Sequence, residues 1–216
     1  MAKLKGTDNG FRGKLGINTV YELNGQVIMR EVGVREKPFT SAELANQQAI
    51  TLISSLLKPA KEFIELGFAT EASKHPTKNY HNMAYSYNYK IALSGTYPDR
   101  CIDFERILFS KGIMPLAENT SALRTDTGIL FEWDTALHHP EFKDTDQVML
   151  LAYFPERKVC VMQPTGIRRK QGVAELILPD ANRPIVLHTY ISFISAQHKI
   201  TSDSVYTGKF VWLSKL

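Results

Sequence analysis

Cysteine is scarce in this sequence, which has two such residues, Cys101 and Cys160, among 216. Two cysteines are too few for a disulfide framework, and their spacing fits no zinc-binding pattern. We therefore expect both to be buried small apolar residues in a reducing compartment, and we expect no metal and no other cofactor.

Long apolar segments are also missing. The longest uninterrupted apolar run is Val148 to Phe154, seven residues, whereas a membrane-spanning helix needs roughly 20. The basic residues at the start of the chain are followed by glycines and polar residues, where a signal peptide has an apolar stretch. We therefore predict a cytoplasmic protein without membrane insertion; export by a non-classical route and incorporation into a larger assembly stay open.

Charge of one sign is in small excess, because 26 Lys and Arg against 22 Asp and Glu give a net charge of +4. Most of this excess lies in the first forty residues, which hold seven basic and four acidic side chains. We interpret it as solvated surface, since dedicated nucleic-acid binders usually gather their charge on one face or element. A nucleic-acid-associated protein is kept as an alternative.

Sequence patterns that carry catalysis are absent. The chain has no G-x-S-x-G nucleophile elbow and no glycine-rich phosphate-binding loop, and neither cysteine lies in an activating motif. The densest group of potential metal ligands runs from His138 to Asp146, but adjacent histidines on an extended loop point apart and no second cluster supplies further ligands. We interpret this group as a polar loop, and we predict that the protein is not an enzyme.

The clearest local signal is a β-hairpin near the amino terminus. Residues 16–23 and 26–32 are rich in β-forming side chains and flank Asn24-Gly25, a dipeptide typical of two-residue type I′ turns. Residues 1–14 contain three glycines among polar side chains, so this segment is predicted to be either mobile or held by a partner surface.

A helical pattern follows the hairpin. Thr40 and Glu43 form a capping box, and apolar residues from Ala49 to Ala60 recur at steps of three and four. We expect Pro59 to kink the helix or to restart it. We expect Gly67 to end the helix in a left-handed conformation.

Residues 80–93 fit two patterns. Tyr85, Tyr87 and Tyr89 alternate as in a strand, whereas other side chains recur at helical spacing, and we favour a helix. The three tyrosines either pack with their hydroxyl groups outward, which we favour, or stack on bases or sugars. Residues 101–110 alternate in polarity and are predicted to form a strand.

The second half of the chain is predicted to be uniformly β. Short strands separated by turn signals, with no helix between them, are typical of an antiparallel sandwich. The predicted strands are residues 121–125, 129–133, 147–154, 158–164, 173–178, 185–194 and 204–212. Trp133 is expected between the two sheets, and His188 is expected to be a structural residue, because its strand is rich in Ile, Val and Leu.

The carboxy-terminal half resembles a fibronectin type III or immunoglobulin-like domain. The segments that carry this resemblance are residues 130–134, 147–153, 173–179 and 186–193. The match covers roughly residues 112–216 as an order of strands. The tyrosine that such domains carry at the start of the penultimate strand is absent, and Ile185, Val186 and His188 occupy that neighbourhood.

The whole chain is also similar to an uncharacterised bacterial family of comparable length. The matching stretches are residues 13–16, Arg30, and residues 38–42, 94–98 and 205–208. The resemblance implies a hairpin-plus-helix front end joined to a β-sandwich, and it brings no activity, cofactor or catalytic residue. We therefore predict an α+β fold that is mostly β, with residues 1–111 as the hairpin-plus-helix region and residues 112–216 as the sandwich domain.

These features favour a non-enzymatic structural or protein-interaction protein, in which the amino-terminal segment and hairpin dock on a partner or on a second copy of the chain. The candidate interaction residues are Lys14, Arg30, Arg35, Arg168, Arg169 and Lys170. The last three are predicted to form a basic hairpin tip. This tip either binds phosphate or an acidic partner or, as we favour, protects an exposed sheet edge from pairing with another chain. A carbohydrate-binding module is a further alternative, with Tyr85, Tyr87, Tyr89 or Trp212 on an exposed flat face.

Overall fold

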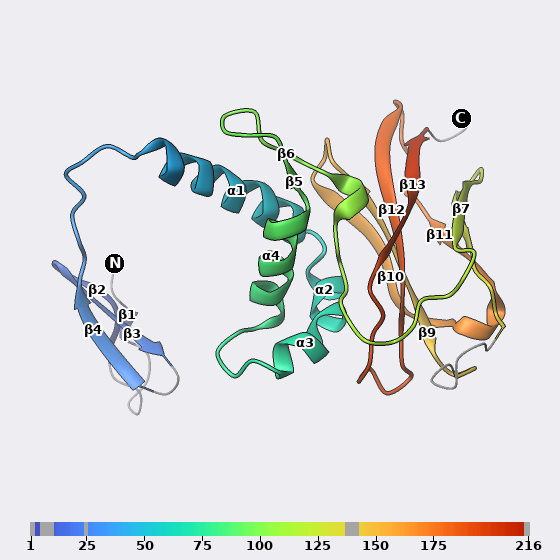
Figure 1. The fold of residues 1–216 in the computed structure, drawn as a ribbon, viewed down its shortest axis with the longest axis horizontal. Coiled ribbons are helices and arrows are strands. Elements are labelled where there is room, and N and C mark those ends of the chain that lie inside the picture. Colours follow the sequence, from blue (N-terminus) through green and yellow to red (C-terminus); the bar gives the residue numbers. More distant parts are fainter. Residues whose placement is uncertain (1–2, 5–10, 24–25, 137–142, 214–216) are drawn as a thin grey trace. The chain divides into compact units, whose positions relative to one another are not determined.

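The computed structural model describes residues 3–4, 11–23, 26–136 and 143–213. The chain divides into two compact units, Met1–Thr40 and Ser41–Leu216 (Figure 1). None of the helices formed by the described residues has the length and the apolar character needed to cross a bilayer.

The first unit contains a four-stranded antiparallel sheet in the order β1-β2-β3-β4. Its strands are Lys3–Leu4 (β1), Phe11–Leu15 (β2), Asn18–Leu23 (β3) and Gln26–Glu31 (β4). The predicted hairpin is present as β3 and β4, which pair from Asn18 opposite Glu31 to Leu23 opposite Gln26. Its Asn24-Gly25 turn lies outside the described residues.

The beginning of this hairpin differs from the prediction. The sequence pattern places Gly16 in the first strand, which is wrong, because Gly16 and Ile17 form the turn between β2 and β3. Gly16 has a φ of +58°, a conformation that glycine adopts without the steric cost of a Cβ atom. Phe11–Leu15 pairs with β3, so this part of the glycine-rich segment is held by the chain's own hairpin.

Helices form the first part of the second unit. They are α1 (Ser41–Leu57), α2 (Lys61–Gly67), α3 (Ala69–Ser73) and α4 (Tyr80–Ile91). Helix α1 begins directly after Thr40, and it buries Ala49, Ile53 and Leu56 at the predicted spacing. Pro59 separates α1 from α2, so the helix restarts there.

Helix α4 confirms the helical interpretation of residues 80–93. Its start is capped by Asn79, whose side-chain Oδ1 accepts a hydrogen bond from the backbone N–H of Asn82 at 2.8 Å. The alternation of tyrosines therefore does not mark a strand here.

Gly67 ends α2 for a reason other than the predicted one. Its φ is not in the left-handed region, so the expectation of a left-handed stop is wrong. A Cβ atom at this position would lie 2.6 Å from the carbonyl oxygen of Phe109 and from the Cβ of Ser110. Glycine is required because a segment distant in sequence passes against the helix end.

Residues 101–110 do not form one strand, contrary to the prediction. The segment contains the short strand β6 (Cys101–Ile102), paired with β5 (Leu93–Ser94), and the 3-10 turn η1 (Phe104–Arg106). The Asp103 carboxylate accepts a hydrogen bond from Glu105 N at 3.1 Å and stabilises the turn. The ring of Phe104 stacks on His188 with centroids 4.1 Å apart, and this tertiary contact overrides the local alternation.

The seven strands predicted for the second half are present, and they form two antiparallel sheets. The smaller sheet has the order β11-β8-β7 and the larger one β10-β9-β12-β13. The strands are Ser121–Arg124 (β7), Gly128–Glu132 (β8), Gln147–Phe154 (β9), Val159–Arg168 (β10), Val173–Ile177 (β11), Ile185–Ile194 (β12) and Val205–Trp212 (β13). The fold is therefore α+β and mostly β, with a sandwich in its second half.

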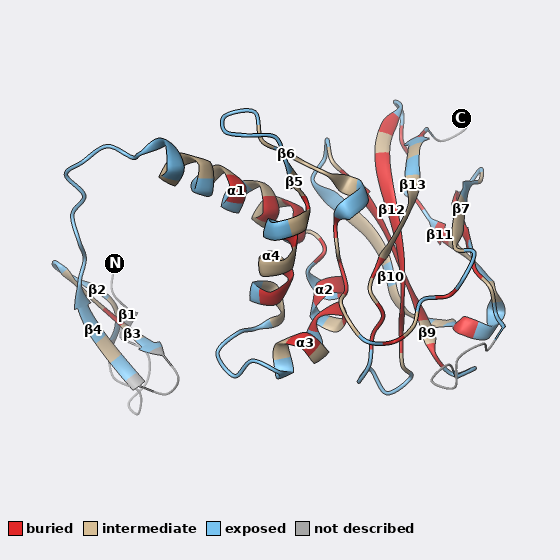
Figure 2. Ribbon diagram, viewed as in Figure 1, coloured by how far each residue is buried: buried red, intermediate tan, exposed pale blue. Residues whose placement is uncertain are grey.

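The larger sheet is covered on both faces, and Figure 2 shows most of β12 as buried. Met149 and Leu151 of β9 pack into a core that the sheet shares with the helices. Their neighbours Val148 and Leu150 pack into a second core, shared with the smaller sheet. This double burial explains why the apolar run of β9 is continuous instead of alternating.

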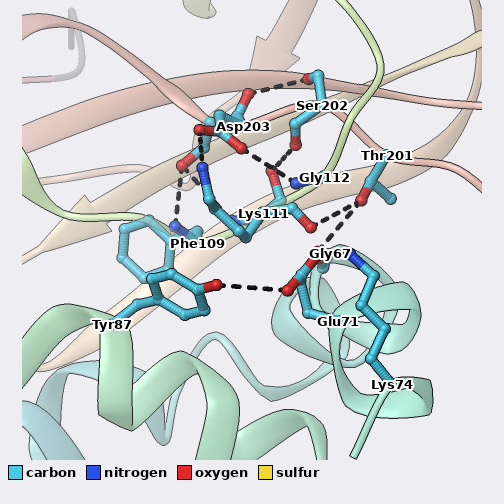
Figure 3. A network of polar contacts seen from close by, with 12 residues as sticks. Gly67, Glu71, Lys74, Tyr87, Phe109, Lys111, Gly112, Thr201, Ser202 and Asp203 are labelled. Atoms are coloured by element: carbon cyan, nitrogen blue, oxygen red, sulfur yellow. Dashed lines mark hydrogen bonds and ion pairs between the residues drawn. The ribbon is translucent and has the colours of Figure 1, made fainter.

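A short connecting segment joins the helices to the sandwich (Figure 3). On the helical side Lys111 N donates to Gly67 O at 3.0 Å, and on the sandwich side Gly112 N donates to Asp203 Oδ1 at 3.0 Å. The hydroxyl of buried Thr201 lies 3.2 Å from Lys111 O and 3.3 Å from Gly67 O, and donates between them. The boundary predicted between residues 111 and 112 thus falls inside a bonded segment of the second unit.

Candidate interaction surface

The amino-terminal sheet has an apolar face that its own unit leaves exposed. Residues directly opposite one another on paired strands share a face, and here Met29 lies opposite Val20. Among residues 12–22 and 27–40, whose exposure the structure describes, Val20 is the one buried hydrophobic side chain, with 9% of its surface exposed. On the same face, Leu15, Val27 and Met29 are 59%, 58% and 60% exposed. Two acidic side chains lie on this face as well, Glu22 opposite Val27 and Glu31 opposite Asn18. We call Leu15, Val20, Val27 and Met29 the apolar face.

The opposite face of this sheet is basic. Lys14 lies opposite Thr19, which in turn lies opposite Arg30, so two of the predicted interaction residues are brought to one face. Both are exposed. The Arg30 guanidinium is 5.6 Å from the centroid of the Tyr21 ring. Lys14, Thr19, Tyr21, Ile28 and Arg30 form the basic face.

Arg35 lies outside the sheet, in the segment 32–40, which is exposed along its whole length. Its Nε donates to Lys37 O at 2.7 Å, and its guanidinium lies 4.2 Å from the ring centroid of Phe39. These contacts are local. The structure therefore does not bring Arg35 onto the basic face.

Arg169 does not belong to an exposed basic tip. Its residue is 2% exposed, and its guanidinium lies 4.3 Å from the ring centroid of Phe193. Its backbone N–H donates to Asp146 O at 2.7 Å, and its carbonyl accepts a hydrogen bond from Trp133 Nε1 at 2.6 Å. Burial lowers the pKa of the guanidinium, and the charge of Asp146 opposes this shift. Arg169 is thus part of the core of the sandwich.

The neighbours of Arg169 remain at the surface. Arg168 and Lys170 are exposed on either side of it. The chain reverses here through a 3-10 turn, Arg169–Gln171 (η2), which ends at Gly172 with a φ of +70°. Two of the three predicted tip residues therefore face solvent, and they lie in a different unit from the basic face.

The aromatic residues considered for carbohydrate binding are spread over different environments. Trp212 is 2% exposed, and its Nε1 donates to Pro179 O at 2.8 Å, so it is not part of an exposed flat face. Tyr85 and Tyr87 are half-buried against the core beneath the helices. Tyr89 is more exposed, and its hydroxyl donates to Asn46 Oδ1 at 3.2 Å.

His188 occupies a buried position on the larger sheet, as expected for a structural histidine. Its Nδ1 lies 3.1 Å from the Tyr206 hydroxyl, and its ring stacks on Phe104. Burial, together with the charge of Lys209 on the neighbouring strand, lowers the pKa of His188 to about 4. Burial also raises the pKa of the Cys160 thiol to about 12. Cys101 lies in the short strand β6 and is exposed, so the expectation that both cysteines are buried is wrong for Cys101.

Among the described residues of the second unit, two pockets have volumes of about 210 Å³ each. One is lined by Leu57, Lys58, Lys61, Tyr80 and His81. The other is lined by Lys143, Thr145, Asp146, Ser195, Ala196, Gln197, Lys199 and Ile200. Within the described residues, no group of three His, Cys, Asp or Glu side chains is placed to hold a metal ion. Of the cluster noted in the sequence, His138, His139 and Glu141 lie outside the described residues.

The apolar face was not found by sequence reasoning, although a signal for it exists. Val27, Ile28 and Met29 are consecutive apolar residues in a strand that the Asn24-Gly25 turn already places at the end of a hairpin. A continuous apolar run indicates a strand covered on both faces. Among the described residues from 3 to 40, the structure shows no helix or strand besides β1 to β4 that could supply two covering layers.

Comparison with known proteins gives one family. The chain matches none of the curated proteins with which it was compared. A model of a family of unknown function, DUF6266, matches residues 11–208, which include β2 to β4, the helices and nearly all of the sandwich. The chain therefore belongs to this family of unknown function, DUF6266.

Proposed function

We propose that this chain is a non-enzymatic assembly protein, whose amino-terminal sheet docks on a protein partner through the apolar face. The observation that carries the proposal is the exposure of Leu15, Val27 and Met29 in a sheet where Val20 is the one buried hydrophobic residue among residues 12–22 and 27–40. A small sheet is stable when its hydrophobic face is covered, so the missing layer is supplied by a partner.

The connection to the rest of the chain supports this role. Residues 32–40 are exposed throughout and contain no helix or strand beyond the end of β4 and before α1. Such a segment allows the sheet to contact a partner at a distance from the second unit, because an extended chain spans up to about 3.3 Å per residue.

The sandwich supports the same class of function by analogy. Counted along the chain, the first, second and fifth strands of the sandwich (β7, β8 and β11) form one sheet. The third, fourth, sixth and seventh strands (β9, β10, β12 and β13) form the other, in the order β10-β9-β12-β13. We assign it a fibronectin type III-like topology, an architecture that often serves as a binding module. This analogy concerns the fold, whereas the docking proposal rests on the apolar face.

Site-specific photo-crosslinking in the full-length chain tests the proposal. A photoreactive phenylalanine analogue at Met29 is expected to form a covalent adduct with a protein in the cells that produce the chain, with the adduct identified by mass spectrometry. The matched control carries the same analogue at Thr19, on the basic face of the adjacent strand. Loss of the Met29 adduct on adding Leu15→Lys would support docking through the apolar face. Equal adducts from both positions, or none from Met29, would contradict it.

A second candidate function is binding of single-stranded nucleic acid by the basic face. The observation that favours it is the placement of Lys14 and Arg30 on the same face as Tyr21, with the Arg30 guanidinium over the Tyr21 ring, since basic side chains around an aromatic ring are typical of such surfaces. Two phosphate contacts predict a loss of affinity of about sevenfold between 50 and 200 mM salt. Fluorescence anisotropy with a labelled oligonucleotide measures this, and affinity that is unchanged by salt and by Lys14→Glu would eliminate the candidate.

A further inference from the structure

Strand β4 presents an open edge. Among the described strands it pairs with β3 and with no other. Val32 N donates to Ile17 O at 2.7 Å, which continues the β3–β4 ladder beyond Glu31. In an antiparallel ladder alternate residues turn their backbone groups toward the partner strand. Ile28 and Arg30 therefore bond toward β3, and the backbone groups of Val27 and Met29 point to the open edge.

This edge is complementary to itself. If two copies of β4 pair antiparallel about Ile28, Ile28 of one copy lies opposite Ile28 of the other. Val27 of each copy then lies opposite Met29 of the other, on the apolar face. These are the residues whose N–H and C=O groups point outward, so each such pair exchanges two backbone hydrogen bonds.

Other registers match less well. Pairing about Arg30 sets two guanidinium groups directly opposite each other, which is destabilising. Pairing about Met29 places the charged side chains of Glu31 and Arg30 opposite Val27 and Ile28. A shift by an odd number of residues sets the apolar face of one copy beside the basic face of the other. Of these registers, pairing about Ile28 is the one that sets apolar side chains opposite apolar side chains with no like charges in contact.

We propose that the amino-terminal sheet also pairs with a second copy of this chain, edge to edge through β4 about Ile28, to give a continuous two-fold symmetric sheet. The inference goes beyond the proposed function, because this pairing completes the edge of β4 and leaves the apolar face to the partner that docks there. In this antiparallel pairing both copies use the same edge of β4, so the contact is isologous. An isologous contact is complete with two copies and therefore gives a dimer. The paired sheets place their apolar faces side by side and double the surface that a further layer can cover.

Disulfide trapping in the full-length chain tests the register. In a Cys101→Ser background, which removes the exposed native thiol, Ile28→Cys is expected to form a dimer disulfide under mild oxidation. Non-hydrogen-bonded opposite residues have Cα atoms about 4.5 Å apart, within disulfide range. Met29→Cys is the matched control, because diagonal positions lie about 7–8 Å apart, beyond that range. We expect trapping at Ile28 to be roughly tenfold faster than at Met29.

A backbone substitution tests the edge itself. Met29→Pro removes an N–H that points to the open edge and that β3 does not use, so it is expected to give a monomer in sedimentation velocity. Met29→Lys keeps the N–H and changes the side chain alone, and it is expected to leave the dimer present. A monomeric wild-type chain with no trapping at Ile28 would overturn the proposal. In that case, a Met29 photo-adduct with a different protein would still support docking through the apolar face.

Discussion

Two four-stranded antiparallel sheets in this chain differ in what covers them. In the larger sheet of the second unit, β9 lies between the helices and the smaller sheet, and its apolar run is buried on both sides. In the sheet of the first unit, β4 carries three consecutive apolar residues, Val27 to Met29, of which Val27 and Met29 are exposed. The two strands have similar patterning, but the described residues of the first unit lack the layers that cover β9.

The difference shows that an apolar run indicates how many covering layers a strand needs. It does not indicate whether those layers come from the same unit. Among residues 12–22 and 27–40, Val20 is the one buried hydrophobic side chain, and so small a core gives a sheet little stability by itself. For β9 the layers come from residues far apart in the same unit. For β4 we infer that they come from another molecule.

The largest expected effect is in the core of the second unit. Phe193 is fully buried, contacts Trp133 edge to face, and lies under the Arg169 guanidinium. We expect Phe193→Ala to lower the free energy of unfolding by about 3–5 kcal/mol. Urea denaturation followed by fluorescence measures this, because both tryptophans lie in the second unit.

The matched control for this substitution is Met29→Ala, in the exposed sheet of the first unit. Because Met29 is 60% exposed, the same transition is expected to change by no more than about 0.5 kcal/mol. A loss comparable to that of Phe193→Ala would mean that the apolar face is covered within one copy of the chain, and the comparison between the two sheets would fail.

A smaller effect is expected from pH. The pKa of His188 is lowered to about 4 in the folded chain from an ordinary 6.5, by burial and by Lys209. Between these values the unfolded chain binds a proton that the folded chain does not bind. The free energy of unfolding therefore falls as the pH decreases from 6.5 to 4, by roughly 3 kcal/mol, and this contribution is constant below pH 4.

Replacement of His188 by Gln should remove that part of the pH dependence in urea titrations at several pH values. The control is His198→Gln, at an exposed position in the loop after β12, which should leave the slope unchanged. An identical slope in wild type and His188→Gln would show that His188 does not set it.

The smallest effect concerns the contact between the helices and the sandwich. The buried Thr201 hydroxyl bonds to the backbone carbonyl oxygens of Lys111 and Gly67. Thr201→Val leaves Lys111 O without this donor, whereas Gly67 O still accepts from Lys111 N, and the substitution is expected to cost about 1–2 kcal/mol. Thr70 donates to Lys199 O at 2.8 Å near solvent, where water replaces the bond. Thr70→Val should therefore cost less than about 0.5 kcal/mol by thermal denaturation.

The strands of the sandwich were predictable because turn residues separate them at short intervals. Asp126-Thr127-Gly128 marks the turn before β8, and a Cβ on Gly128 would meet Leu176 O. Errors occurred where a distant contact decided the local structure. The stacking of Phe104 on His188 and the passage of Phe109 beside Gly67 join residues far apart in the sequence.

The candidate surface was predictable in part. The hairpin and the place of Arg30 in it follow from the sequence, because an Asn-Gly turn fixes which residues of two strands oppose each other. The strand β2 was missed, and with it the positions of Lys14 on the basic face and of Leu15 on the apolar face. For Arg169 the error is the reverse, because a buried residue was predicted to be exposed. Three consecutive basic residues indicate a solvent-exposed segment, and nothing in the local sequence shows that the middle one packs on Phe193.

The double burial of β12 limits how this protein can vary. Tyr190 and Ile194 pack toward the helices, whereas Ile191 and Phe193 pack toward the smaller sheet. A larger side chain at any of these sites would press the strand against the opposite core, so a tolerated change on one side requires a compensating change on the other. Random mutagenesis should therefore recover paired substitutions along β12, while single viable substitutions should concentrate in the segment that precedes α1.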